Sequence, residues 1–189
     1  MPLKTLVKVG SITNLSDARY CAGMGVNLLG FRVLEGQENY INPKTFQEIR
    51  GWVTGPAIVA EIYGVTSAEE LRQIMADYRP DYLEMDTADF HCIGEHIALP
   101  YILSIKDSLT TNVPALRPQP AYLQVLPQAN AGNLSLPVLW AIKTKDEAAS
   151  AVANPDVKGI CLDGGHEIRP GLKHYDDLGD ILELLETES

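Results

Sequence analysis

Short runs of apolar residues recur along the whole chain, and each has the length and composition of a β-strand. The runs are rich in Val, Ile, Leu and Tyr, and most are bounded by Gly, Pro, Asn or Asp, which favour turns. We therefore predict strands at every run. The eight runs are 6–10, 27–33, 57–63, 81–86, 101–106, 121–126, 137–143 and 157–163.

Helical patterns separate many of these runs. Ser67 and Glu70 form a capping box in front of an apolar helical spacing that begins at Leu71. Thr144 and Glu147 repeat this signal after the seventh run. Helices are thus predicted after the third and seventh strands. Further helical patterns cover 42–52 and 178–185.

Strands that alternate with helices predict a parallel sheet with right-handed crossovers, which is the α/β class. Eight strands favour one (β/α)8 barrel domain over residues 1–189, although the usual lower limit for that fold is about 200 residues. Segments 107–120 and 127–136 are rich in Pro, Asn and Gly. We therefore expect the helices after strands five and six to be shortened or missing. An open doubly wound sheet is the alternative.

Charge and cysteine content exclude several classes of protein. The chain has 25 Asp and Glu against 15 Lys and Arg, a balance that argues against nucleic-acid binding. No apolar run approaches the roughly 20 residues of a membrane span, and the first ten residues lack the apolar core of a signal peptide. Cys21, Cys92 and Cys161 are scattered and lack metal-ligand spacing. We expect a cytoplasmic monomer or homodimer with reduced thiols and without metal or cofactor.

The N-terminal stretch Val-Lys-Val-Gly-Ser-Ile-Thr-Asn at 7–14 is followed by Asp17 and Ala18. It resembles the opening of the phosphoribosylanthranilate isomerase family, which typically reads Val-Lys-Ile-Cys-Gly-Ile-Thr. This resemblance implies a (β/α)8 barrel. It also implies an Amadori isomerisation, in tryptophan biosynthesis, of an N-linked phosphoribosyl aminoaldose to an aminoketose. Further matching segments, in the same order, are 29–31, 40–43, 67–71 and 167–173.

The chain departs from the family pattern at the positions that carry the chemistry. The resemblance places a general acid–base pair on a first-strand Cys and on an Asp at the end of strand six. Gly10 and Val125 occupy these positions, and neither side chain transfers protons. The family Arg that would meet the anthranilate carboxylate is Asn39, and the phosphate-binding glycine pair after strand seven is replaced at 141–143. The ordinary family mechanism is therefore not expected here.

A glycine pair, Gly164 and Gly165, directly follows the eighth strand. Loops after strands seven and eight of such barrels often bind phosphate through backbone N–H groups, which glycine lets a ligand approach. Lys143 or Arg169 would supply positive charge. We predict an anion at this turn, with an ordinary tight turn as the alternative.

Residue parity predicts which side chains enter the barrel, because positions i and i+2 of a strand share a face. Glu61, Asp86 and Lys106 lie near the carboxyl ends of three consecutive strands, where barrel enzymes keep their reacting groups. We predict that these three line one pocket. A polar interior of unreactive ion pairs is the alternative. Other polar groups with the same placement are Lys8, Arg32, Tyr63, Glu84, Ser104, Gln124, Lys143 and Asp163.

Together these observations predict a phosphoribosylanthranilate-isomerase-like barrel that binds or isomerises a small phosphorylated metabolite. Two alternatives stay open. One is a non-catalytic barrel that binds a metabolite or a partner protein, and the other is a true phosphoribosylanthranilate isomerase that uses different residues.

Overall fold

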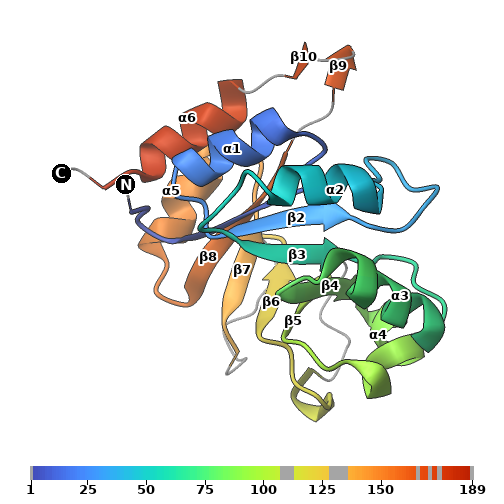
Figure 1. Ribbon diagram of the computed structural model, residues 1–189. Coiled ribbons are helices and arrows are strands. Elements are labelled where there is room, and N and C mark those ends of the chain that lie inside the picture. Colours follow the sequence, from blue (N-terminus) through green and yellow to red (C-terminus); the bar gives the residue numbers. More distant parts are fainter. Residues whose placement is uncertain are drawn as a thin grey trace.

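Eight parallel strands close into a barrel in which each strand is hydrogen-bonded to the next and β8 returns to β1 (Figure 1). The computed structural model describes residues 2–106, 113–127, 136–164, 167–169, 172–173 and 176–187. The predicted (β/α)8 barrel is confirmed, and the open sheet is excluded. The strands are β1 Leu6–Gly10, β2 Leu28–Arg32, β3 Ala57–Glu61, β4 Tyr82–Asp86, β5 Tyr101–Ile105, β6 Tyr122–Val125, β7 Val138–Ala141 and β8 Val157–Asp163.

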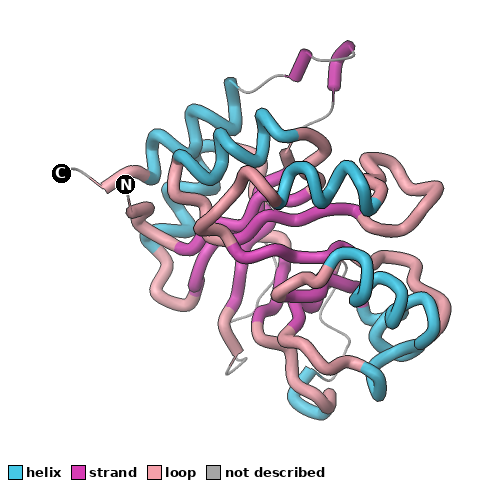
Figure 2. The backbone as a smooth tube through the Cα atoms, viewed as in Figure 1, coloured by secondary structure: helices cyan, strands magenta, loops and turns pink. Residues whose placement is uncertain are grey.

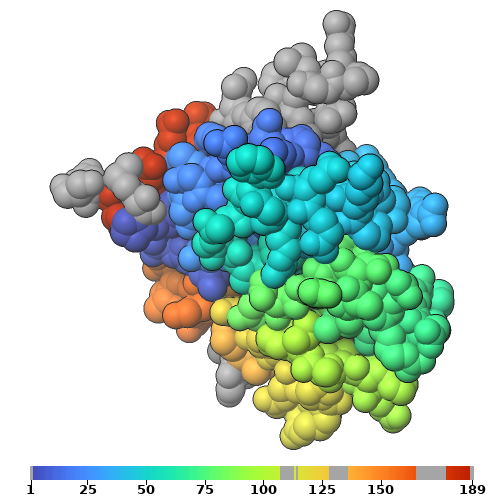
Figure 3. Space-filling view, in the orientation of Figure 1, coloured from blue at the N-terminus to red at the C-terminus, as the bar shows by residue number. Residues whose placement is uncertain are grey.

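Helices lie outside the strands, and in the space-filling view those of the N-terminal half cover the face shown (Figures 2 and 3). Between β5 and β6 the described residues contain only the short 3-10 turn η2 (Val113–Ala115), and most of the segment between β6 and β7 lies outside the described residues, so the predicted loss of a helix there stays a prediction. A small antiparallel pair, β9 (Glu167–Arg169) and β10 (Leu172–Lys173), follows β8. The helices are α1 Leu15–Gly23, α2 Pro43–Arg50, α3 Ala68–Tyr78, α4 Thr87–Ile93, η1 Gly94–His96, α5 Lys145–Ala153 and α6 Asp176–Leu185.

Helix starts follow the capping signals. The Thr144 hydroxyl accepts the N–H of Glu147, whose carboxylate accepts the N–H of Thr144, so this capping box is complete. Ser67 likewise accepts the N–H of Glu70. The Glu70 carboxylate turns instead to the N–H and hydroxyl of Thr66, so this box is only half formed. Both caps fix the point at which the chain leaves the carboxyl end of a strand.

The barrel interior is apolar at the amino-terminal ends of the strands and polar at their carboxyl ends. Leu28, Val59, Ile102, Leu139 and Cys161 form a small inner cluster, separate from the main core between strands and helices. Positions two residues further along the same strands share this face and are small or polar. They are Gly30, Glu61, Ser104, Ala141 and Asp163. The polar layer therefore collects at the carboxyl-terminal mouth. No helix in the described ranges has the length and apolar character needed to cross a membrane.

Candidate active site

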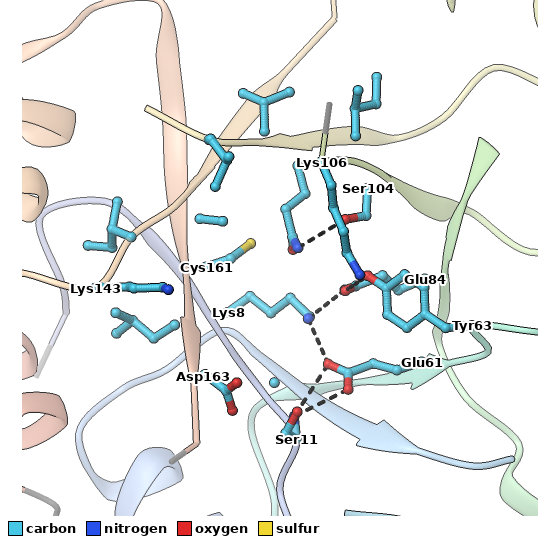
Figure 4. Close-up of a pocket in the computed structure, with 18 of the residues that line it drawn as sticks. Lys8, Ser11, Glu61, Tyr63, Glu84, Ser104, Lys106, Lys143, Cys161 and Asp163 are labelled. Atoms are coloured by element: carbon cyan, nitrogen blue, oxygen red, sulfur yellow. Dashed lines mark hydrogen bonds and ion pairs between the residues drawn. The ribbon is translucent and has the colours of Figure 1, made fainter. Parts of the chain in front are cut away.

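A cavity of about 420 Å³ opens at the carboxyl-terminal mouth of the barrel (Figure 4). Glu61 and Lys106 line it, as predicted from parity, and Lys143 lies at its edge on the segment after β7. Gly10 and Val125 also line it, at the ends of β1 and β6. These two positions lie where the family resemblance expects the acid–base pair, and they bring neither an acid nor a base.

An ion triad forms the floor of the cavity. The Lys8 ammonium lies 2.8 Å from Oε1 of Glu61 and 2.5 Å from Oε2 of Glu84, and each of the three residues is 2% exposed. Burial alone would lower the pKa of Lys8. The negative charges of Glu61 and Glu84 outweigh this effect and raise that pKa above its usual value. Lys8 therefore stays charged and holds the two carboxylates together.

Glu61 is surrounded by donors from two other strands. Besides Lys8, its oxygens accept the N–H of Ser11 at 3.2 and 3.4 Å. The Arg32 Nε lies 3.6 Å from its Oε2. A buried carboxylate needs such partners, because unpaired burial costs several kcal/mol. Glu61 is thus fixed in place at the inner end of the cavity.

Glu84 is less completely paired. The Tyr63 hydroxyl donates to its Oε1 at 2.5 Å, whereas its Oε2 contacts Lys8 as an ion pair but lacks a well-directed hydrogen bond among the described residues. Burial raises the pKa of the Glu84 carboxyl. The Lys8 charge opposes this rise and the Glu61 charge adds to it. A carboxylate with a raised pKa is a stronger base, so Glu84 is a candidate proton acceptor.

Tyr63 connects this floor to the cations at the mouth. Lys106 Nζ lies 5.1 Å and the Arg32 guanidinium 5.6 Å from the centre of its ring, within the range of cation–π contact. Burial, followed by the charges of Glu84 and Glu61, raises the pKa of the Tyr63 phenol well above its usual value. Tyr63 therefore remains protonated and acts as a donor.

The prediction that Asp86 lines the pocket is wrong. Asp86 ends β4, and α4 starts at the next residue, so its carboxylate turns to the unpaired N–H groups of that helix. It accepts the N–H of Ala88 at 2.8 Å and that of Asp89 at 3.0 Å. Glu84, two residues earlier on the same face of β4, provides the carboxylate in the cavity. Strand parity predicts that both Glu84 and Asp86 face the barrel interior. It does not show that one of the two carboxylates caps the following helix instead.

The predicted anion turn is only partly described. The Gly164 N–H donates to the Gly10 carbonyl at 2.8 Å, so this donor is already used within the protein. Gly165 and the side chain of Arg169 lie outside the described residues. Lys143 is exposed at the mouth of the cavity. Anion binding at the turn stays a prediction, and Lys143 is the described group that favours it.

In the described part of the chain, no three His, Cys, Asp or Glu residues are grouped as metal ligands. Cys21, Cys92 and Cys161 are free thiols, as predicted. Cys161 lies beside Lys8, but burial raises the pKa of its thiol, so it is a poor nucleophile. Proton transfer by Glu84 and its neighbours is the chemistry that these residues offer.

Comparison with known proteins agrees with this barrel. No family model matches the chain. The N-(5'-phosphoribosyl)anthranilate isomerase of Thermosynechococcus vestitus is 25% identical in an alignment that is 211 positions long with its gaps and that covers 98% of this chain and 90% of that protein. The chain is therefore similar to a phosphoribosylanthranilate isomerase over nearly its whole length. The predicted family assignment is thereby supported.

Solved phosphoribosylanthranilate isomerases have the same fold. TrpF from Jonesia denitrificans superposes with a TM-score of 0.74 at 16% identity, over 95% of each chain. The Thermus thermophilus enzyme gives a TM-score of 0.71 at 18% identity, over 94% of this chain and 96% of its own. Another phosphoribosylanthranilate isomerase structure, with a TM-score of 0.73 at 15% identity and 95% and 97% coverage, is a complex with reduced 1-(o-carboxyphenylamino)-1-deoxyribulose 5-phosphate.

Proposed function

We propose that this barrel binds a small phosphorylated sugar-type metabolite in its cavity and isomerises it from aldose to ketose without the acid–base pair usual in the family. The observation that carries the proposal is the buried Glu84 carboxylate, held by Lys8 and Tyr63 beneath an open cavity. The names of the relatives support the substrate class, because they are isomerases of a phosphoribosyl compound and one binds a ribulose 5-phosphate derivative.

An Amadori-type isomerisation needs an acid and a base. Ring opening breaks the bond between C1 and the ring oxygen, protonates that oxygen and leaves an iminium group. Loss of the C2 proton then gives an enolamine, which converts to the ketose. In this proposal Lys106 donates the proton to the ring oxygen, and Glu84 accepts the proton from C2. Positioned acid or base groups typically contribute about 10²- to 10⁴-fold each to such a rate.

The phosphate is proposed to bind at the mouth rather than at the floor. Lys143 is exposed there and lines the cavity. Charge-assisted hydrogen bonds from ammonium groups to phosphate oxygens are stronger than neutral ones. The floor, by contrast, holds two carboxylates that would repel a dianion. This arrangement orients the sugar with its phosphate outward and its reacting carbons towards Glu84.

Two alternative functions are each supported by one observation. The mutual pairing of Lys8, Glu61 and Glu84 favours a non-catalytic binding barrel, since paired charges can simply fill a polar interior. The full-length similarity to a phosphoribosylanthranilate isomerase favours ordinary isomerase activity by unfamiliar residues.

Complementation of a tryptophan auxotroph that lacks this isomerase separates these readings, together with turnover assays on purified protein. The proposal expects no complementation, turnover of an aldose phosphate or its N-linked derivative, and a loss of about 10²-fold or more in Glu84→Gln. Robust complementation would favour the true isomerase. D-ribose 5-phosphate binding without turnover of any tested aldose phosphate would favour the binding barrel.

A matched lysine pair controls for charge. Lys143 lies at the mouth, whereas Lys158 is exposed near the start of β8, at the opposite end of the barrel. Lys143→Met is expected to weaken binding of D-ribose 5-phosphate, and Lys158→Met is expected to leave it unchanged. Equal effects of the two substitutions would mean that net charge, rather than a site at the mouth, drives binding.

A further inference from the structure

We infer that Glu61 stands in the space that a side chain at position 10 would need, and that Gly10 and Gly30 are positioning residues that admit its carboxylate. Position 10 ends β1, and Glu61 ends β3, so the carboxylate reaches across β2 to arrive there. The inference deepens the proposed function, and only its ligand-binding consequence rests on that proposal.

The close approach is geometric. A Cβ on Gly10 would stand 2.5 Å from Oε1 of Glu61 and 3.1 Å from Nζ of Lys8. A Cβ on Gly30 would meet the same Glu61 oxygen even more closely, and would stand 2.9 Å from its carboxyl carbon. Carbon and oxygen atoms that are not bonded do not approach to such distances, so a side chain at either position would displace the carboxylate.

Backbone conformation does not explain these two glycines. The glycines with positive φ are Gly25, Gly36, Gly55 and Gly64 among the described residues, so Gly10 and Gly30 adopt angles open to any residue. Space is therefore the reason for glycine at positions 10 and 30. Because position 10 carries no side chain, the Glu61 carboxylate has room at the end of β1.

Moving the Glu61 carboxylate out of this space would break several of its contacts. Its oxygens are held by the Lys8 ammonium and the Ser11 N–H, with Arg32 close by, and the side chain is buried. Moving it would leave Lys8 with one carboxylate partner instead of two. A side chain at position 10 and the carboxylate at position 61 are therefore mutually exclusive in this barrel. The Glu61 carboxylate faces the cavity at the place where a side chain at position 10 would lie. Its ion pair with Lys8 also keeps that ammonium beside Glu84.

A double-mutant cycle on thermal unfolding tests the exclusion. Gly10→Ala is expected to lower the unfolding midpoint of the natural chain by about 5 °C or more. In a Glu61→Ala background the same change is expected to shift the midpoint by no more than about 2 °C, because the space is then free. Gly23→Ala is the matched control, since a Cβ there meets nothing within 4 Å. Because Ala favours a helix more than Gly does, this control is expected to raise the midpoint slightly and by the same amount in both backgrounds.

The cycle has a decisive outcome even if one variant fails to fold. Failure of Gly10→Ala alone, with folding restored by adding Glu61→Ala, supports the inference. If Gly10→Ala leaves the unfolding midpoint unchanged, or lowers it equally in both backgrounds, the inference is overturned.

A spectroscopic measurement separates positioning of Glu61 from general destabilisation. The carboxyl ¹³C resonance of Glu61, assigned by its loss in Glu61→Gln, is expected to move in Gly10→Ala and not in Gly23→Ala.

Ligand binding is a separate test of the role of Glu61. D-ribose 5-phosphate is expected to lose about tenfold or more in affinity in Gly10→Ala, in Glu61→Ala and in the double variant. A natural chain that does not bind this compound would count against the proposed function, whereas the unfolding cycle and the ¹³C shift would still decide the placement of Glu61. Undiminished affinity in all three variants would overturn the role of Glu61 at the cavity.

Discussion

The Tyr63 hydroxyl donates a hydrogen bond of 2.5 Å to Oε1 of Glu84, which joins the floor of the barrel cavity to the ring beneath Lys106. This bond stabilises the charged carboxylate and so acts against the burial that raises the pKa of Glu84. Tyr63 thereby helps to set the pH at which Glu84 can accept a proton.

Removal of that hydroxyl by Tyr63→Phe is expected to raise the pKa of Glu84 further. A base must be deprotonated to act, so the acid limb of the pH–rate profile of an aldose phosphate should move to higher pH. Direct titration of the Glu84 carboxyl by ¹³C NMR should move in the same direction. An unchanged titration in Tyr63→Phe would show that the hydrogen bond does not hold in solution.

Stability should also depend on pH through Glu84. Because its pKa in the folded protein is raised above the usual 4.5, the folded state binds this proton more tightly than the unfolded state does. The stabilisation is complete below that usual value and is lost as the pH rises through the pKa of the folded state. Denaturant unfolding over this window should therefore show a fall in free energy that Glu84→Gln reduces. An identical slope in the variant would contradict the raised pKa.

Lys8→Met should be severe, since it leaves two buried carboxylates without their shared cation. Breaking a buried ion pair in this way typically costs about 3–5 kcal/mol in the free energy of unfolding. Denaturant unfolding measures the loss, and Lys158→Met on the exposed end of β8 is the control. Adding Glu84→Gln to Lys8→Met should recover part of the loss. No recovery would mean that the two residues are not coupled.

Lys106→Met separates a ligand site from an inert interior. The ammonium is exposed and lies over Tyr63, so the fold should survive its loss with little change in unfolding midpoint. Affinity for D-ribose 5-phosphate should nevertheless fall by about tenfold, equivalent to about 1.4 kcal/mol. A fall in stability with unchanged affinity would assign Lys106 to the structure of the mouth rather than to binding.

Asp86→Ala should behave in the opposite way. Loss of a helix N-cap typically costs about 1 kcal/mol, so α4 should be destabilised while ligand affinity stays the same. Asp86→Asn keeps a good capping group and serves as the matched control. An effect of Asp86→Asn on affinity, without a loss of stability, would return Asp86 to the site.

Much of the site was predictable because strand parity is local. The alternation along the runs at 57–63 and 101–106 placed Glu61 and Lys106 inside the barrel, and both line the cavity. The error at Asp86 has a local cause as well, because α4 begins directly after it with a capping box between Asp86 and Asp89. Asp is a preferred N-cap residue, and Asp86 and Asp89 have capping-box spacing, but strand parity alone does not take this cue into account.

Periodicities of two and of 3.6 residues within short segments predict the barrel and the polar character of its mouth. The pairing of the polar groups, by contrast, is visible only in the folded barrel. Lys8 lies between Glu61 and Glu84, and the Glu61 carboxylate fills the space beside Gly10, because barrel closure brings strands far apart in the chain to one point. Such contacts depend on strand register and on how far each side chain reaches across the barrel. Neither can be predicted from the sequence of one segment.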